Sequence, residues 1–306
     1  MRWRLGTRGS RLALAQADQV AAALRAVGVE IEIVSIRTSG DRLAQVALAE
    51  FGGKALFVKE IEDGLLDKRI DLAVHSLKDM PAVLPAGLVL GAFPAREDPR
   101  DTLITRGAGG LDGLAAGSVV ATSSLRRRAL LLGRRPDLVV APIRGNVDTR
   151  LAKLDRGECA ALVLAQAGLD RLGVAPAHAC PLPADEFVPA VGQGILAVEV
   201  READREVLEL LGAVNDTRTG MEARAERSFL RELGADCHTP VAAHARVDGN
   251  VLSLRGFVAR SDGREALRSE ARGPSSSAAA LGAQVARDLL ARGAAALLAS
   301  PPGDGD

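Results

Sequence analysis

The sequence contains only three cysteines, Cys159, Cys180 and Cys237, and no Cys-x-x-Cys pair. Such a sparse and odd number argues against a disulfide framework and favours a reducing compartment. No apolar run approaches the roughly 18 residues of a membrane-spanning helix. Residues 1–6 also lack the apolar core of a signal peptide. We therefore expect a cytoplasmic protein with no membrane partner.

The chain also lacks net charge, because 39 basic residues balance 39 acidic ones. This balance argues neither for nor against a nucleic-acid partner, and we expect none. Lysine is scarce, so nearly all the basic residues are arginines, whose planar fork suits carboxylates and phosphates. Neither a Gly-x-Gly-x-x-Gly nor a Gly-x-x-x-x-Gly-Lys-Ser/Thr loop occurs, which counts against a nucleotide-dependent transferase.

A short buried strand is predicted over residues 70–74, and the polar segment HSLKDMP follows it at 75–81. In open α/β sheets, ligands bind at the carboxyl ends of strands. Pro81 restrains the backbone around it, so the turn that carries Asp79 should be stiff. On these residues alone, a capping role for Asp79 and a solvated Lys78 explain the pattern as well as a binding site does.

Near the N-terminus, Ser10 is placed to cap a helix over residues 11–27, and a strand should follow at 30–36. Arg8 and Ser10 then lie where a loop enters a helix. This is a natural anion site, although a cap with a solvated arginine is the commoner outcome. The next segments are expected to be a long loop and a helix, at residues 38–53 and 57–67.

A second α/β unit is expected from about residue 101, with strands at 118–121, 138–143 and 160–164. Each strand is followed by hydroxyl or basic residues. Because these strand ends occupy equivalent topological positions, their side chains should form a pocket for a substrate with several carboxylates or phosphates. The residues concerned are Thr122, Ser124, Arg126, Arg127, Arg144, Arg150 and Arg171.

Two segments punctuated by proline or glycine, residues 94–101 and 189–194, are interpreted as crossings between the first two units. The second crossing would return the chain to the first sheet as a strand at 195–200. A small third domain of α+β type should follow. Its expected helices are 222–234 and 278–292, and its expected strands are 241–245, 251–259 and 267–272.

Cys237 lies in a polar turn after a predicted helix, whereas most free cysteines are buried structural residues. The adjacent His238 would suit a metal, but no second cluster of cysteine and histidine is near in sequence, so we expect no metal. An accessible thiol can instead anchor a group covalently.

The sequence thus predicts a carboxylate on a turn, an arginine-lined cleft and a thiol on a third domain. The carboxylate can stabilise a developing positive charge while the arginines hold anionic groups away from the reacting atom. These features suggest a substrate with an anionic rim and a cationic reacting centre. A two-domain binding protein for a small anion explains the cleft and the arginines equally well, but it does not explain the thiol.

Eight blocks of this sequence follow the order of the porphobilinogen deaminases (hydroxymethylbilane synthases), which the chain resembles over nearly its whole length. The blocks are residues 8–14, 53–59, 74–81, 98–101, 122–127, 143–150, 189–194 and the turn at Cys237. Departures are few. Ala235, Asp236 and His238 surround the cysteine where the family often has Gly-Gly and Gln, and Ala55 and Ala121 replace common glycines.

The resemblance implies two α/β domains that form a periplasmic-binding-protein-like pair of type II, plus a small α+β domain. The expected boundaries are 1–95 with 195–213, then 100–190, then 217–306. It also implies a dipyrromethane cofactor joined to Cys237 by a thioether. Four porphobilinogen units would be added stepwise with loss of ammonia, and hydrolysis would release a linear tetrapyrrole. The expected partner is porphobilinogen, and the expected state is a monomer.

Family resemblance further implies that Asp79 lies against the pyrrole nitrogens and stabilises the azafulvenium-like cation formed as ammonia leaves. Other residues would hold the acetate and propionate groups. Those assigned to the cofactor, besides Cys237, are Ser76, Lys78, Thr122, Ser124, Arg126, Arg127 and Arg150. Those assigned to the substrate are Arg8, Ser10, Gln16, Arg144, Arg171, Gln193, Lys54 and Lys59, the last two in a loop expected to cover the cleft.

Overall fold

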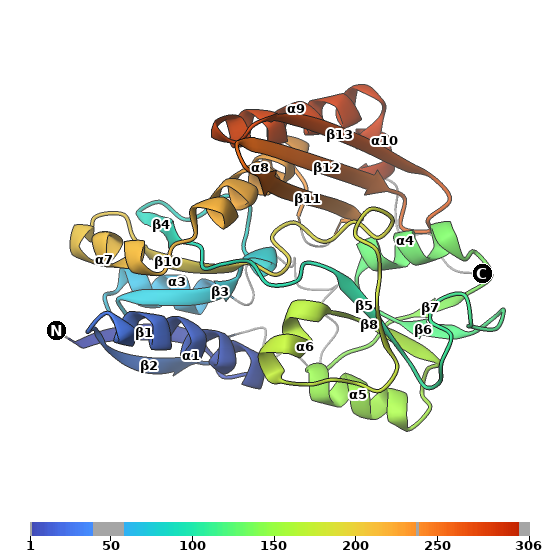
Figure 1. Ribbon diagram of the computed structural model, residues 1–306, viewed down its shortest axis with the longest axis horizontal. Coiled ribbons are helices and arrows are strands. Elements are labelled where there is room, and N and C mark those ends of the chain that lie inside the picture. The colour runs from blue at the N-terminus through green and yellow to red at the C-terminus, as the bar shows by residue number, and fades with distance from the viewer. Residues whose placement is uncertain (1, 39–57, 237–238, 300–306) are drawn as a thin grey trace.

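The computed structural model describes residues 2–38, 58–236 and 239–299, and these residues form three β-sheets (Figure 1). In Figure 1 the first sheet lies at the left, the second at the right and the third above both. No helix in the described ranges is long and apolar enough to cross a membrane. This architecture confirms the predicted α/β class, with two sheet-and-helix units and a small α+β unit.

The first sheet has the order β2-β1-β3-β10-β4, and β10 is antiparallel to both of its neighbours. Helices cover both faces, so β3 is buried at its first four positions and reads as a nearly continuous apolar run. The strands are β1 (Arg2–Arg8), β2 (Glu30–Ile36), β3 (Leu72–Ser76), β4 (Leu88–Ala92) and β10 (Leu196–Arg201). The helices are α1 (Arg11–Ala26), α3 (Lys59–Leu66) and α7 (Arg205–Leu210).

The second sheet repeats this arrangement with the order β7-β6-β8-β5-β9. Strands β6, β7 and β8 are parallel, whereas β5 is antiparallel to β8. The strands are β5 (Asp101–Thr105), β6 (Val119–Ala121), β7 (Val139–Ala141), β8 (Ala161–Ala165) and β9 (Ala179–Pro181). The helices are α4 (Leu125–Arg134), α5 (Val147–Asp155) and α6 (Gln166–Leu172). The carboxyl ends of three parallel strands therefore meet at one edge.

The third sheet is an antiparallel meander, β11-β12-β13, with α8 and α9 packed on one another and against its strands. Phe229 of α8 is fully buried at the centre of this unit. The strands are β11 (Val241–Asp248), β12 (Val251–Ala259) and β13 (Ala266–Pro274). The helices are α8 (Thr217–Leu233), α9 (Ala278–Ala291) and α10 (Ala294–Ala299).

Two crossing segments, residues 93–100 and 189–195, join the first two units and run side by side. The Glu97 N–H donates to the Gly194 carbonyl, with 3.2 Å between nitrogen and oxygen. The third unit is fastened to the same junction by Arg96, whose Nη1 lies 2.7 Å from Oε1 of Glu226 on α8. The other Glu226 oxygen accepts the Gly192 N–H at 2.6 Å. One buried ion pair thus links both crossings to α8.

Several predicted elements need correction. No strand was expected before Ser10, but Arg2–Arg8 form the seven-residue strand β1, which pairs with β2 along its whole length. Helix α8 begins at Thr217 rather than at 222, because Asp216 caps it by accepting the Thr219 N–H at 2.7 Å. Strand β5 and helices α6 and α10 were not predicted. The predicted loop at 38–53 falls almost entirely outside the described residues.

Candidate active site

A cavity of about 860 Å³ lies between the first and second α/β units. Its walls come from the N-terminus of α1, the end of β3 and the segments that follow β6, β7 and β8. Among the described residues, eight cationic side chains line it, against two carboxylates, Asp79 and Asp148. The cations are Arg8, Arg11, Lys78, Arg127, Arg128, Arg144, Arg150 and Arg171. Such a surface favours a ligand with several carboxylates or phosphates.

Asp79 is carried by a short 3-10 turn, η2 (Leu77–Asp79), directly after β3. The Leu77 N–H donates to the Ile195 carbonyl at 3.0 Å, which ties the turn to the start of β10. Gly192 lies against this turn with a φ of +72°, and a Cβ there would be 2.8 Å from Leu77 Cγ. Glycine is therefore required at this position. The Asp79 side chain lines the cavity and accepts no hydrogen bond from the described residues.

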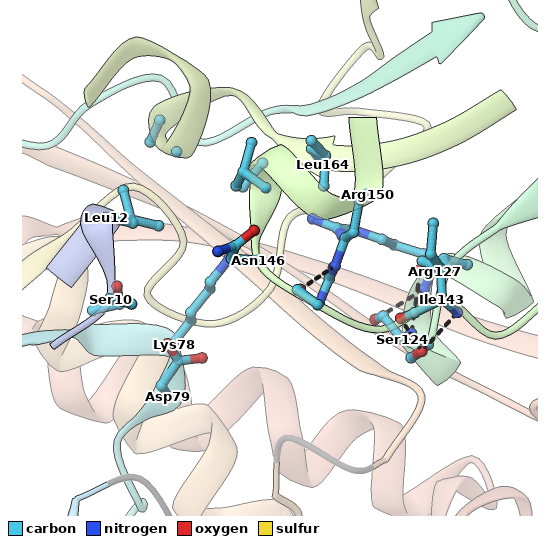
Figure 2. A pocket seen from close by; sticks show the side chains of 18 of the residues that line it. Ser10, Leu12, Lys78, Asp79, Ser124, Arg127, Ile143, Asn146, Arg150 and Leu164 are labelled. Atoms are coloured by element: carbon cyan, nitrogen blue, oxygen red, sulfur yellow. Dashed lines mark hydrogen bonds between the residues drawn. The ribbon is translucent and has the colours of Figure 1, made fainter. Parts of the chain in front are cut away.

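Lys78 stands beside Asp79. Figure 2 shows both side chains on one wall of the cavity, with Arg127 and Arg150 on the opposite wall. Burial lowers the pKa of Lys78 to about 8, although the charge of Asp79 opposes the shift. The ammonium is therefore still charged at neutral pH, but it loses its proton well below the pH at which an exposed lysine does.

The N-terminus of α1 presents polar groups to the same cavity. Ser10 is the N-cap of α1, and its hydroxyl accepts the Ala13 N–H at 3.2 Å. Gln16, one turn further along, donates from Nε2 to Ser76 Oγ at 2.8 Å. This bond joins α1 to the end of β3, so the two elements of the first unit that line the cavity are held together near Asp79.

The strand ends of the second unit carry helix caps that face the cavity. Ser124 caps α4 by accepting the Arg127 N–H at 3.4 Å, and Thr122 Oγ1 accepts the Ser124 N–H at 3.2 Å. Asn146 caps α5 by accepting the Thr149 N–H at 2.9 Å. Two helix N-termini therefore point at the same space, where their backbone dipoles favour an anion.

Asp101 is fully buried behind this wall and is surrounded by donors. Its oxygens lie 2.6 Å from Nη1 of Arg126 and 2.8 Å from Nη2 of Arg127, and Gln193 donates to it at 2.9 Å. Burial alone would raise the pKa of Asp101, but the two guanidinium charges outweigh it and hold the pKa below its usual range. Asp101 thereby fixes the orientation of Arg127 at the cavity wall.

Arg150 and Arg171 retain donors that no described carboxylate occupies. Arg150 donates from Nε to the Gly145 carbonyl at 2.8 Å, and burial lowers the pKa of its guanidinium, as does the charge of Arg127. Arg171 donates from Nη2 to the Gly194 carbonyl at 2.8 Å, while its buried Nε has no hydrogen-bond partner among the described residues. Partly buried, incompletely satisfied guanidiniums are suited to bind an anionic group of a ligand.

The structure brings twelve of the residues singled out from the sequence to this one cavity: Arg8, Ser10, Gln16, Ser76, Lys78, Asp79, Thr122, Ser124, Arg127, Arg144, Arg150 and Arg171. Three others do not line it. Arg126 and Gln193 are buried against Asp101, and Lys59 is the first residue of α3, where it pairs with Asp63 at 3.1 Å. Lys54 and Cys237 lie outside the described residues.

Sequence reasoning did not single out Asp101, Asn146 or Glu226. Asp101 appeared only as one charge in a polar crossing segment, and no local pattern distinguishes a buried acid there from a solvated one. Asn146 could have been found, because an Asn directly before a helix is a common N-cap. The position of Glu226 in the middle of α8 gave no signal, since its partners, Arg96 and Gly192, are distant in sequence.

Comparison with known proteins agrees with this geometry. Residues 3–209 match the family described as "Porphobilinogen deaminase, dipyromethane cofactor binding domain", and residues 221–291 match "Porphobilinogen deaminase, C-terminal domain". The porphobilinogen deaminase of Syntrophotalea carbinolica is 48% identical over 97% of this chain and 95% of its own length. That of Desulforudis audaxviator is 50% identical, with 96% of each chain covered.

A solved ancestral cationic amino acid solute binding protein shares 13% identity, with a TM-score of 0.43, over 70% of this chain and 88% of its own. The sequence relatives, by contrast, match along almost the entire length at nearly half of all positions. This chain therefore belongs to the porphobilinogen deaminase family.

Proposed function

We propose that this chain joins four porphobilinogen molecules head to tail, with release of ammonia, to give the linear tetrapyrrole hydroxymethylbilane. The observation that carries the proposal is the contrast within one cavity between the Asp79 carboxylate, which accepts no hydrogen bond from the described residues, and the ring of cationic side chains. A porphobilinogen unit carries two carboxylates and an aminomethyl group that leaves as ammonia. The cavity thus offers cations to the carboxylates and one anion to the reacting centre.

A dipyrromethane cofactor fits this cavity, because its acetate and propionate groups need several cations and the wall supplies donors that no described carboxylate occupies. When bound, the cofactor supplies the pyrrole carbon to which the first unit is joined. The residues proposed to hold its carboxylates are Ser76, Lys78, Thr122, Ser124, Arg127 and Arg150. Arg126 would act through Asp101, and we assign the covalent link to Cys237.

The substrate carboxylates are assigned to the first unit and to the segments after β7 and β8. The residues proposed for them are Arg8, Ser10, Gln16, Arg144 and Arg171. In that orientation the departing ammonia leaves a positive charge on the pyrrole ring beside Asp79. A carboxylate on a turn that Ile195 holds in place stabilises such a charge more than water does, because the turn is already in position as the charge develops.

An Asp79→Asn variant tests the role of this carboxylate, since it removes the charge and nearly preserves the shape. We expect the turnover number to fall by about 10²–10³, as is typical when one preorganised electrostatic group is removed, with little change in KM. Asp148→Asn is the matched control, because Asp148 lines the same cavity but already pairs with Arg11 at 2.9 Å. A normal rate of tetrapyrrole formation in Asp79→Asn would exclude the proposed role.

We further propose three domains, residues 1–95 with 195–213, 100–190 and 217–306, each built around one of the three sheets. A cytoplasmic monomer is the proposed state. It is supported by the sparse cysteines and by the scatter of the large apolar side chains that are exposed in the described part of the chain.

A further inference from the structure

Three ionisable side chains meet on the face of the first sheet that α3 covers. Glu62 comes from α3, His75 from β3 and Glu199 from β10, and their exposures are 5%, 6% and 0%. His75 Nε2 lies 3.0 Å from Glu199 Oε2. On the same face, the apolar residues Ile61 and Leu65 of α3 pack with Ala73 of β3. This cluster lies outside the cavity described above and has no part in the proposed chemistry.

The cluster has an excess of acceptors. Glu62 Oε1 and Glu199 Oε1 are both buried, and neither has a hydrogen-bond partner among the described residues. The charged neighbours of Glu62, besides Glu199 and His75, are Asp63 and Lys59 of its own helix, which pair with each other at the surface. Arg227 of α8 is the further cation that acts on Glu199, and its Nη2 donates to the Ala82 carbonyl.

Two buried carboxylates beside one imidazole would be costly if both were ionised. A proton on Glu62 would remove one of the two buried negative charges. Burial, and then the charge of Glu199, raise the pKa of Glu62 to about 7, which agrees with a proton held there in neutral solution. The burial of Glu62 and the charges around it therefore both favour its protonated form.

We propose that Glu62 keeps a proton at neutral pH, and that this protonated acid, beside the His75–Glu199 pair, positions the turn that carries Asp79. The two strands that carry His75 and Glu199, β3 and β10, also hold that turn. His75 is the penultimate residue of β3, which the turn η2 with Asp79 follows directly, and β10 begins beside Ile195, whose carbonyl accepts the Leu77 N–H. Loss of the proton would leave two buried anions between α3 and the strands that hold this turn.

The sign of the pH dependence follows from linkage. A carboxyl group whose pKa is raised in the folded state stabilises the fold below its unfolded pKa of about 4.3, and this stability is lost as the pH rises to about 7. Within that window one extra proton is bound by the folded state. The unfolding equilibrium constant should therefore rise about tenfold per pH unit from this site alone.

The experiment compares the pH dependence of unfolding for the full-length protein, Glu62→Gln and Asp67→Asn. Asp67 is the matched control, because it is an exposed acid at the C-cap of the same helix. We expect Glu62→Gln to lose the dependence of about tenfold per pH unit and Asp67→Asn to keep it. The same slope in Glu62→Gln as in the unsubstituted protein would overturn the proton on Glu62, whatever the enzyme's activity.

Two further readouts complete the test. The infrared spectrum of the unsubstituted protein should show a protonated carboxylic acid at about pH 6 that is lost by about pH 8.5, and the absence of this band would overturn the proposal even if Glu62→Gln did not fold. Turnover, which rests on the proposed function, should fall as the pH rises through 7 in the unsubstituted protein but not in Glu62→Gln. Identical pH profiles would overturn the positioning role.

Discussion

Replacing Asp101 with asparagine removes the negative charge that faces two buried guanidiniums. Asp101 is completely buried, and Arg126 and Arg127 are only 4% and 8% exposed. Four guanidinium N–H groups approach its oxygens at 2.6–3.2 Å, and Gln193 adds a fifth contact at 2.9 Å. The asparagine would accept some of these bonds, but it would leave two like charges without compensation in a dry interior.

The cost of breaking a buried ion pair by removing one partner is about 3–5 kcal/mol. We expect the free energy of unfolding of Asp101→Asn to fall by that amount, measured by urea denaturation followed by circular dichroism. Asp98→Asn is the control from the same crossing segment. Asp98 pairs with Arg100 at 2.6 Å, but the two side chains are 25% and 44% exposed, so its loss should cost about 0–1 kcal/mol. Equal, small losses in the two variants would refute the assignment of Asp101 as the centre of this network.

Three further outcomes are expected. Affinity for a polycarboxylate ligand should weaken as the pH rises through about 8, where Lys78 loses its proton. Lys78→Gln should abolish this dependence and raise KM by about 10–100-fold, since one charge-assisted hydrogen bond is lost. Gly192→Ala should lower turnover by about tenfold or more, because its Cβ would push Leu77 and displace the Asp79 turn; an unchanged rate would contradict this contact. Phe229→Ala should lower the free energy of unfolding by about 3–5 kcal/mol, measured by denaturation, because the ring is fully buried in the third unit.

Much of the fold could be predicted because its signals are local. The Ser10 cap and the periodic apolar residues after it are enough to define α1, whose start agrees with the prediction. The hydroxyl and arginine residues after β6, β7 and β8 were expected at one edge because they follow successive strands, and the parallel pairing of β6 with β7 and β8 places them there. The return of β10 to the first sheet is likewise confirmed.

The remaining features depend on contacts between residues far apart in the chain. Arg126 and Arg127 are adjacent in sequence and both bind Asp101, yet Arg127 also lines the cavity, whereas Arg126 donates to the Val188 carbonyl. No periodicity argument separates the two, because the contacts that distinguish them join residues far apart in the chain, such as Arg126 and Val188, which are 62 residues apart. The Glu62–Glu199–His75 cluster could not be predicted for the same reason. Its members come from three elements, and an acid on a helix is a solvated residue in most sequences.

The denaturing intact mass of the freshly purified protein, with a peptide map across residue 237, tests the central claim most directly. We expect added mass equal to two linked pyrrole units on the peptide that holds Cys237, and no such mass in Cys237→Ser. An unmodified Cys237 that stays unmodified after incubation with porphobilinogen would contradict the assignment of this chain as a tetrapyrrole-building enzyme with a covalent dipyrromethane.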